Sequence, residues 1–289
     1  MAKPVTNRAA SVKDRLLALA REQGRVFDVV LIRYALERLL CRLSVSSKRH
    51  EFVLKGGMLV SIWLENANRE TRDIDFLGHG DAQEATLKET FREIMSIAMD
   101  DGLAFDLDAI ESSPIREDAE YAGVRLKTSA FLERTRIPVT IDIGFGDAVQ
   151  PEARQVEYPS LLGMENPSIV TYPPALVIAE KFQAMVALGA INSRMKDYFD
   201  IWAISQSMEI ADADLDAAID ATFGRRKTEV PTDRPPGLSA SFIGDATKQA
   251  QWRAYARTIL LNEIRLEEIV DAIWKLVAPS CARLLASRK

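Results

Sequence analysis

The stretch KGGMLVSIWLENANRETRDIDF, residues 55–76, decides the fold of this chain. After Lys55 come the glycine pair Gly56 and Gly57 and an amphipathic segment, and a strand-like run with Asp73 and Asp75 follows. Residues two apart on a strand point to the same face of the sheet. A glycine turn just upstream exposes backbone N–H groups, which favour anions. We therefore expect strand, glycine turn, helix and strand, with both carboxylates beside the turn.

Two carboxylates held on one face repel each other. At about 4 Å the repulsion energy is on the order of 4 kcal/mol even at an effective dielectric near 20. A pair of carboxylates held in a cleft therefore favours the binding of a divalent cation. Together with the exposed N–H groups, this arrangement suits a metal ion and a triphosphate. The alternative is that Asp73 and Asp75 lie on a solvated strand face.

A third carboxylate, Asp142, occurs in IPVTIDIGFGD at residues 137–147. Apolar residues alternate through this segment, which predicts a strand with one apolar face and puts Asp142 on the other face. Three acids can then converge on one site. Asp147 is an alternative third carboxylate, but its position after a glycine at the strand end favours a turn.

Five blocks of the sequence resemble, in order, the DNA polymerase beta type nucleotidyltransferase superfamily and, more closely, the AbiEii/MenT toxin family. The blocks are FVLKGGM at 52–58, RDIDF at 72–76, DIGFGD at 142–147, AEK at 179–181 and KDYFDI at 196–201. The superfamily often has a serine where this chain has Gly57. Backbone N–H groups would then replace the serine hydroxyl at a phosphate.

The resemblance implies a metal-dependent nucleotidyltransferase that uses an NTP and Mg2+ or Mn2+. In this reading Asp73, Asp75 and Asp142 are catalytic metal ligands, and Gly56 and Gly57 bind the nucleotide.

The helical blocks add three further residues to the implied site. Lys181 matches the family lysine that pairs with the phosphates, Asp197 matches a catalytic Lys-Asp element, and Asp200 lies on the same helical side and is assigned to nucleotide binding. The alternative for either acid is an i,i+3 or i,i+4 pair with Arg194 or Lys196.

The resemblance also implies a biological role. Such proteins are the toxin half of a type IV toxin–antitoxin or abortive infection system, with a cognate antitoxin as partner. In MenT-type members the acceptor is the 3′ end of tRNA, so that translation stops. Two other classes stay open: modification of a protein hydroxyl, as in AMP transfer, and a non-catalytic nucleotide-binding regulator.

Charge is distributed unevenly along the chain, which carries a net charge of −5. Residues 1–50 hold eleven Lys and Arg against four Asp and Glu, whereas residues 81–123 hold three against twelve. An acidic protein can therefore present a basic face to RNA. The candidate cations are Lys13, Arg15, Arg21, Arg38 and Arg42 of the N-terminal helices, or these side chains simply solvate the helices.

A second basic element, Arg225, Arg226 and Lys227, precedes a proline-containing segment and is a candidate RNA-binding loop.

Two cysteines, Cys41 and Cys281, are expected to be core thiols. With no apolar run of about 18 residues and no signal pattern, we expect a cytoplasmic protein without a membrane partner.

The periodicity predicts an α+β fold, a mixed-sheet nucleotidyltransferase core with N-terminal helices and a helical C-terminal half. Helices are expected over 11–24, 26–43 and 82–99, and strands over 103–110, 123–131 and 137–145. We expect two domains, the core at 1–150 and a helical domain at 151–289 that closes the cleft.

Overall fold

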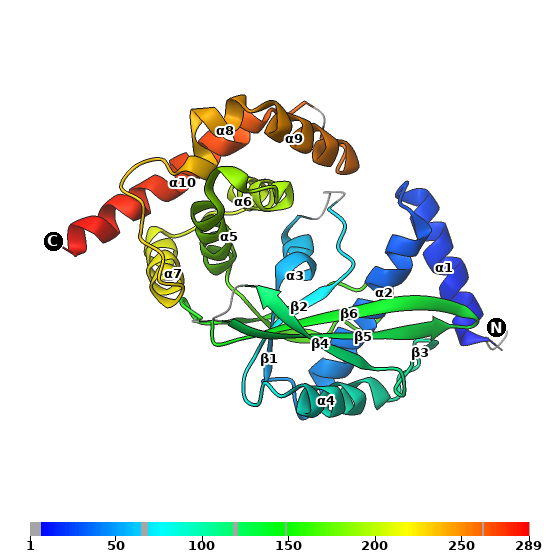
Figure 1. Ribbon diagram of the computed structural model, residues 1–289. Coiled ribbons are helices and arrows are strands. Elements are labelled where there is room, and N and C mark those ends of the chain that lie inside the picture. Colours follow the sequence, from blue (N-terminus) through cyan, green and yellow to red (C-terminus); the bar gives the residue numbers. More distant parts are fainter. Residues whose placement is uncertain (1–6, 65–68, 118–120, 148, 262, 289) are drawn as a thin grey trace. The chain divides into compact units, whose positions relative to one another are not determined.

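The computed structural model describes residues 7–64, 69–117, 121–147, 149–261 and 263–288 (Figure 1). The chain forms two compact units, and each unit is assembled from three separate segments. The first unit comprises residues 1–58, 70–146 and 155–171, and the second comprises residues 59–69, 147–154 and 172–289. The two units are therefore interleaved along the chain.

The first unit is built on a mixed sheet. Its helices and strands are α1 (Arg8–Glu22), α2 (Phe27–Val45), β1 (Phe52–Lys55), β2 (Ile74–Gly78), α4 (Glu84–Ser96), β3 (Leu103–Phe105), β4 (Glu111–Glu117), β5 (Tyr121–Leu132), β6 (Thr135–Phe145) and β8 (Ser168–Thr171). The sheet order is β3-β5-β6-β2-β1-β8-β7, with β4 paired to β5 and β7 formed by Arg154–Glu157. Strands β1 and β2 pair antiparallel, whereas β2 and β6 pair parallel. The predicted α+β fold with a mixed sheet is confirmed.

One face of this sheet is apolar and covered by helices. Phe52 of β1 and Phe76 of β2 pack around Phe91 of α4, with ring centroids 5.0 and 6.2 Å from that of Phe91. Helix α2 packs on β6 and β8. Because side chains alternate along a strand, the opposite face receives the polar residues of β2 and β6.

Helix α2 is buried on almost every side, and its cations are held internally. Arg42 donates to Asp101 at 2.6 Å, and Arg38 pairs with Glu37. Glu37 also accepts the backbone N–H of Leu161 at 2.8 Å. The expectation that Arg38 and Arg42 lie on a basic surface was wrong, because an ion on a buried helix needs an internal partner.

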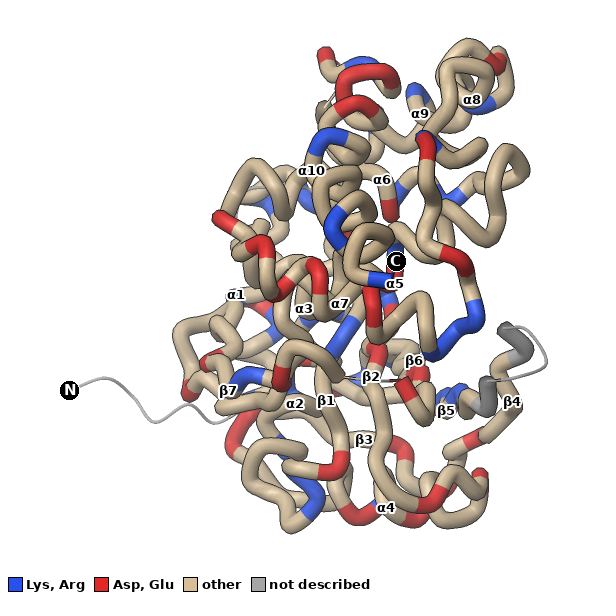
Figure 2. Tube along the Cα trace, turned by 90° about the vertical axis from the view of Figure 1, so that its left-hand side faces the viewer, with Lys and Arg blue, Asp and Glu red and all other residues tan. Residues whose placement is uncertain are grey.

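Asp and Glu positions gather on and beside α4, as Figure 2 shows.

Helix α1 begins before residue 11, where the helix was expected to start, because Asn7 is its N-cap: Asn7 Oδ1 accepts the N–H of Ala10 at 3.0 Å. Cys41 and Cys281 are buried free thiols, as expected.

The second unit is largely helical. It contains α5 (Pro174–Leu188), η1 (Gly189–Ile191), α6 (Met195–Ser207), α7 (Asp212–Arg225), η2 (Pro236–Leu238), α8 (Ala240–Gly244), α9 (Ala246–Thr258) and α10 (Leu266–Ser287). Helix α3 (Gly56–Trp63) begins in the first unit and continues into the second. Strands β7 and β8 were not expected after residue 151. Each is only four residues long, too short for a clear alternating pattern.

One stretch of the described chain, Pro174–Ile191, is long and apolar enough by composition to cross a membrane. This corrects the expectation that no apolar run reaches that length. Half of the stretch is buried inside the structure, and α5 packs against α6 and α7. A core helix meets the same criterion, so the feature is weak support for a membrane span.

Candidate active site

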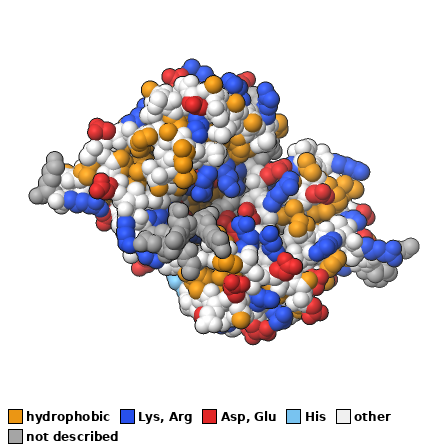
Figure 3. Space-filling view, viewed as in Figure 1, with side chains coloured by type: hydrophobic (Ala, Val, Ile, Leu, Met, Phe, Trp, Pro, Cys, Tyr) orange, Lys and Arg blue, Asp and Glu red, His pale blue; other side chains and the backbone are white. Residues whose placement is uncertain are grey.

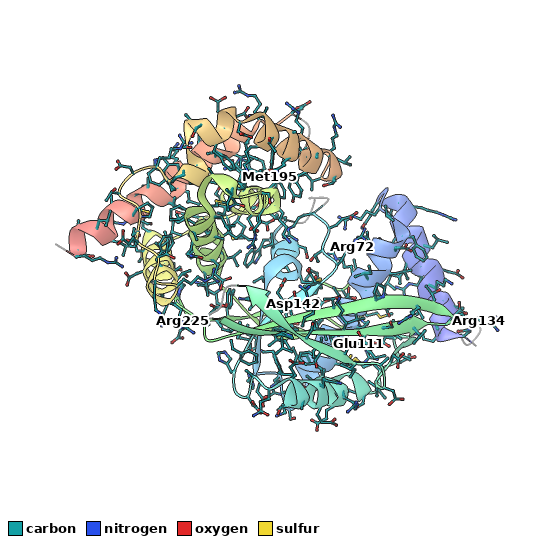
Figure 4. All side chains as sticks on the ribbon, viewed as in Figure 1. Arg72, Glu111, Arg134, Asp142, Met195 and Arg225 are labelled. Carbon is teal, nitrogen blue, oxygen red and sulfur yellow. The ribbon has the colours of Figure 1, made fainter. Side chains whose placement is uncertain are left out.

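Four charged residues form one row across the open face of the sheet. In the strand register, Arg125 on β5 lies opposite Asp142 on β6, Asp142 lies beside Asp75 on β2, and Asp75 lies opposite Lys55 on β1. Residues at the same register position share a face. The structure therefore brings two of the three predicted acids side by side; Figure 4 labels Asp142 in the middle of the sheet.

The glycine pair brings the first turn of α3 directly against Asp75. Gly56 has φ of +65°, a conformation that glycine adopts readily, and a Cβ at this position would lie 1.9 Å from Asp75 Oδ2. The N–H of Gly57 donates to the same oxygen at 3.4 Å. One of the N–H groups expected at a phosphate thus contacts a carboxylate of the site.

Burial and neighbouring negative charges both raise the pKa of Asp75. Burial raises the pKa of Asp75 to about 6, and the charges of Asp73 and Asp142 add to that effect. Lys55 and the Gly57 N–H act in the opposite direction without cancelling it. The three acids are therefore close enough to interact.

Asp142 is held by Arg125, a residue that the sequence did not predict to be in the site. Arg125 donates to both oxygens of Asp142, from Nε at 2.7 Å and from Nη2 at 2.6 Å. Lys55 was also missed as a site residue, although it begins the deciding stretch; a Cβ on Gly144 of β6 would lie 3.8 Å from its Nζ. Only the register between distant strands identifies these cations.

The residues present fit a divalent cation in their chemistry. Asp73 and Asp75 supply oxygen ligands of the kind that Mg2+ and Mn2+ prefer, and the repulsion at Asp75 is what a cation would relieve. Within the described residues, however, no group of three His, Cys, Asp or Glu is already arranged as a metal site. Asp142 can ligate a metal only if it shares or loses its bonds to Arg125.

A separate ionic cluster lies inside the second unit and contains the three predicted helical residues. Lys181 Nζ lies 2.6 Å from Asp197 Oδ1 and 2.9 Å from Asp200 Oδ2. Arg194 Nε also lies 2.6 Å from Asp197 Oδ2, so the alternative i,i+3 pair is formed alongside the pair with Lys181. The Lys181 side chain is 12% exposed, and its ammonium group contacts both carboxylates.

Asp200 is held from its other side by Arg69, which the sequence reading did not identify. Arg69 Nε and Nη2 donate to the two oxygens of Asp200 at 2.7 and 2.8 Å. Burial alone would raise the pKa of Asp200, but Lys181 and Arg69 lower it to about 2. With three cations against two carboxylates, this cluster carries an excess positive charge that suits phosphate.

The basic element at residues 225–227 is only partly exposed. Arg226 Nη1 donates to Gln183 at 2.8 Å, and its Nη2 lies 3.8 Å from Asp147 and 3.7 Å from Glu180. Arg225 ends α7 and is exposed, as Figure 4 shows. Asp147, the alternative third carboxylate, therefore belongs to the second unit and pairs there.

Comparison with known proteins gives one family. The family model described as "Nucleotidyl transferase AbiEii toxin, Type IV TA system" matches residues 38–275. No protein of curated function matches the sequence. The fold is similar to JHP933 from Helicobacter pylori, at 14% identity and a TM-score of 0.48, over 89% of this chain and 94% of that chain. A putative nucleotidyltransferase from H. pylori gives the same identity and TM-score over 89% and 96%.

Proposed function

Because this chain belongs to the AbiEii family of nucleotidyltransferase toxins of type IV toxin–antitoxin systems, we propose that it transfers nucleotides from an NTP to the 3′ end of tRNA and so blocks translation. The observation that carries the proposal is the row that places Asp75 beside Asp142, with the glycine turn against Asp75. A non-catalytic nucleotide-binding regulator would have no use for acids held together at such an electrostatic cost.

The three acids, Arg125 and the glycine pair each have a role in this proposal. Asp73, Asp75 and Asp142 would hold Mg2+ or Mn2+, which when bound would stabilise negative charge on the reacting phosphate. Asp142 accepts the proton of the attacking hydroxyl. Arg125 keeps both oxygens of Asp142 oriented until substrate arrives, and Gly56 and Gly57 bind the nucleotide.

In the second unit, Lys181 pairs with the phosphates of the NTP, and Asp197 and Asp200 position its ammonium group. We expect Lys181→Ala to lower kcat/KM for the NTP about tenfold or more, equivalent to about 1.4 kcal/mol. Lys275→Ala on the exposed face of α10 is the matched control. Steady-state kinetics on variants with wild-type circular dichroism measure this effect, and an unchanged kcat/KM would remove Lys181 from the nucleotide site.

The proposed acceptor is tested with labelled NTP, purified total tRNA and Mg2+ or Mn2+. We expect label on tRNA that RNase releases and protease does not, with added nucleotides at the sequenced 3′ ends and no product in EDTA. Labelled product that only protease degrades would favour transfer to a protein hydroxyl. Separate reactions with each NTP identify the nucleotide.

Two further parts of the proposal follow from the family. A cognate antitoxin is the expected protein partner, and the cytoplasm, where tRNA is found, is the expected location. Arg225, Arg226 and Lys227 remain candidates for RNA contact. Of these, Arg226 also serves inside the second unit through Gln183.

A further inference from the structure

The open face of the sheet continues beyond the acids along β5 and β6. The register between these two strands is unbroken from Gly123 to Leu132, so side chains alternate between the two faces along the whole pair. The residues that share the face of Arg125 and Asp142 are Lys127, Ser129, Phe131, Arg136, Pro138 and Thr140. We call this surface the β5–β6 face. Lys127, Arg136 and Pro138 are exposed, so the face is open to a ligand.

Two cations of the β5–β6 face keep donors for a ligand. Arg136 Nε donates to Ser129 Oγ at 2.8 Å, which directs the guanidinium group from β6 across to β5. Within the residues that the structure describes, neither Lys127 nor Arg136 makes an ion pair, although Glu111 lies opposite Lys127 on β4. Both side chains can therefore donate to an anion on this face.

The cations of the face lie at increasing distance from Asp142. Arg125 contacts it directly, from Nη2 at 2.6 Å. Lys127 lies opposite Thr140, two residues along β6, and Arg136 lies six residues along, about 20 Å of strand. Figure 3 shows Lys and Arg side chains, next to Asp and Glu side chains, on the surface over β5 and β6. A long anion on this face would reach the acids with one end.

The same face carries an aromatic ring. Phe131 lies opposite Arg136 and is half-buried. An aromatic side chain on a strand face can stack on an unpaired base, and single-stranded RNA leaves its bases unpaired. Cations combined with a ring suit a single-stranded nucleic acid better than a small anion, which has no base to stack.

We propose that the β5–β6 face binds the single-stranded 3′ end of the acceptor RNA. Lys127 and Arg136 contact its phosphates, Phe131 stacks on a base, and the strand runs along β6 towards Asp142. The inference rests on the proposed function and specifies where the acceptor is held. The guanidinium group of Arg136 matches the geometry of phosphate oxygens, and Lys127 acts as a point charge.

The test measures RNA binding without any reaction. Fluorescence anisotropy gives Kd for a single-stranded RNA with the sequence of a tRNA 3′ end, in EDTA and without NTP, over a series of NaCl concentrations. The variant Lys127→Gln/Arg136→Gln is compared with Arg49→Gln/Lys88→Gln. This control removes the same charge from the segment before β1 and from α4, which covers the other face of the sheet. Melting temperatures should stay close to that of wild type, because Lys127 and Arg136 are exposed.

We expect the Lys127/Arg136 variant to bind this RNA about tenfold more weakly. Its slope of log K against log salt should fall by about 1.4, at about 0.7 for each phosphate. The control variant should change both quantities much less. Equal losses in the two variants, or no loss in the first, would overturn the assignment.

Phe131→Leu separates stacking from charge. We expect this variant to bind the RNA about fivefold more weakly with an unchanged salt slope, because loss of a stacked base releases no counterions. Affinity equal to that of wild type would overturn the stacking contact.

Steady-state kinetics distinguish the acceptor from the nucleotide. The Lys127/Arg136 variant should raise KM for tRNA about tenfold and leave KM for the NTP unchanged. An equal rise in both values would place the two cations at the nucleotide and contradict the inference.

Failure of this inference and failure of the proposed function give different results. Wild-type protein that transfers nucleotides to tRNA, together with normal RNA binding by the Lys127/Arg136 variant, contradicts only the binding surface. RNA binding that depends on Lys127 and Arg136, without nucleotide transfer by the wild type, contradicts only the reaction.

Discussion

Asp75→Asn is expected to lower nucleotide transfer by at least about a hundredfold while the fold stays intact. The change removes the charge at the centre of the row, next to Asp142 and beneath the first turn of α3. Amide and carboxylate have nearly the same shape, so packing is preserved. Transfer to tRNA is measured for this variant and for Asp108→Asn, an exposed acid of the same unit. Transfer at the wild-type rate would contradict the metal assignment.

The same variant carries a stability signature that does not depend on activity. The pKa of Asp75 is raised from 3.8 to about 6, so the folded state binds a proton more readily than the unfolded state. Its contribution to stability is therefore complete below pH 3.8 and is lost as pH rises through about 6. We expect Asp75→Asn to melt higher than wild type at pH 8, with the difference shrinking towards pH 4. Mg2+ should raise the melting temperature of wild type more than that of the variant.

In cells, the proposed chemistry predicts that overproduced wild-type protein arrests bacterial growth and that Asp75→Asn does not. Damage by catalysis needs the acids, whereas sequestration of tRNA or aggregation does not. Growth curves with sequenced tRNA 3′ ends compare the two proteins at equal expression. Equal toxicity of both would contradict a catalytic toxin.

Gly56→Ala is expected to have a comparable effect for a steric reason. The new Cβ would lie 1.9 Å from Asp75 Oδ2, and the residue would be strained at φ of +65°. Either Asp75 or the start of α3 must move, so we expect loss of most transfer activity and a lower melting temperature.

Gly24→Ala is the matched control for this substitution. Gly24 has nearly the same φ, +62°, but no atom lies within 4 Å of the place that an added Cβ would take. It therefore reports backbone strain alone, on the order of 1 kcal/mol. The excess effect of Gly56→Ala over Gly24→Ala measures the close approach to Asp75; equal effects would show that the approach is unimportant.

Local patterns predicted much of the first unit, and long-range pairing explains what they missed. The alternation through residues 137–147 indicated a strand with Asp142 on its polar face, and β6 has this burial pattern. No local pattern shows that Arg125 lies opposite Asp142, because that depends on strand register. Arg69 and Asp200 are 131 residues apart, so the sequence offers no signal for their pairing.

Local sequence patterns also do not show which cationic side chains are buried. Arg38 and Arg42 have the sequence character of surface cations, and their burial follows from the way α2 is enclosed. Arg25 and Arg33 have a similar sequence character but are only half-buried. Only the structure separates the cations that are enclosed in the fold from those that reach solvent.

The interleaved segments have a consequence for synthesis on the ribosome. Arg69 belongs to the second unit, but its partner Asp200 is made 131 residues later. At about 5–20 residues per second, that interval is on the order of ten seconds. In the later part of this interval, once Asp142 has been made, the nascent chain holds the acids of the first unit but lacks the complete ionic cluster around Lys181. A protein that we propose blocks translation therefore depends on uninterrupted translation for its own completion.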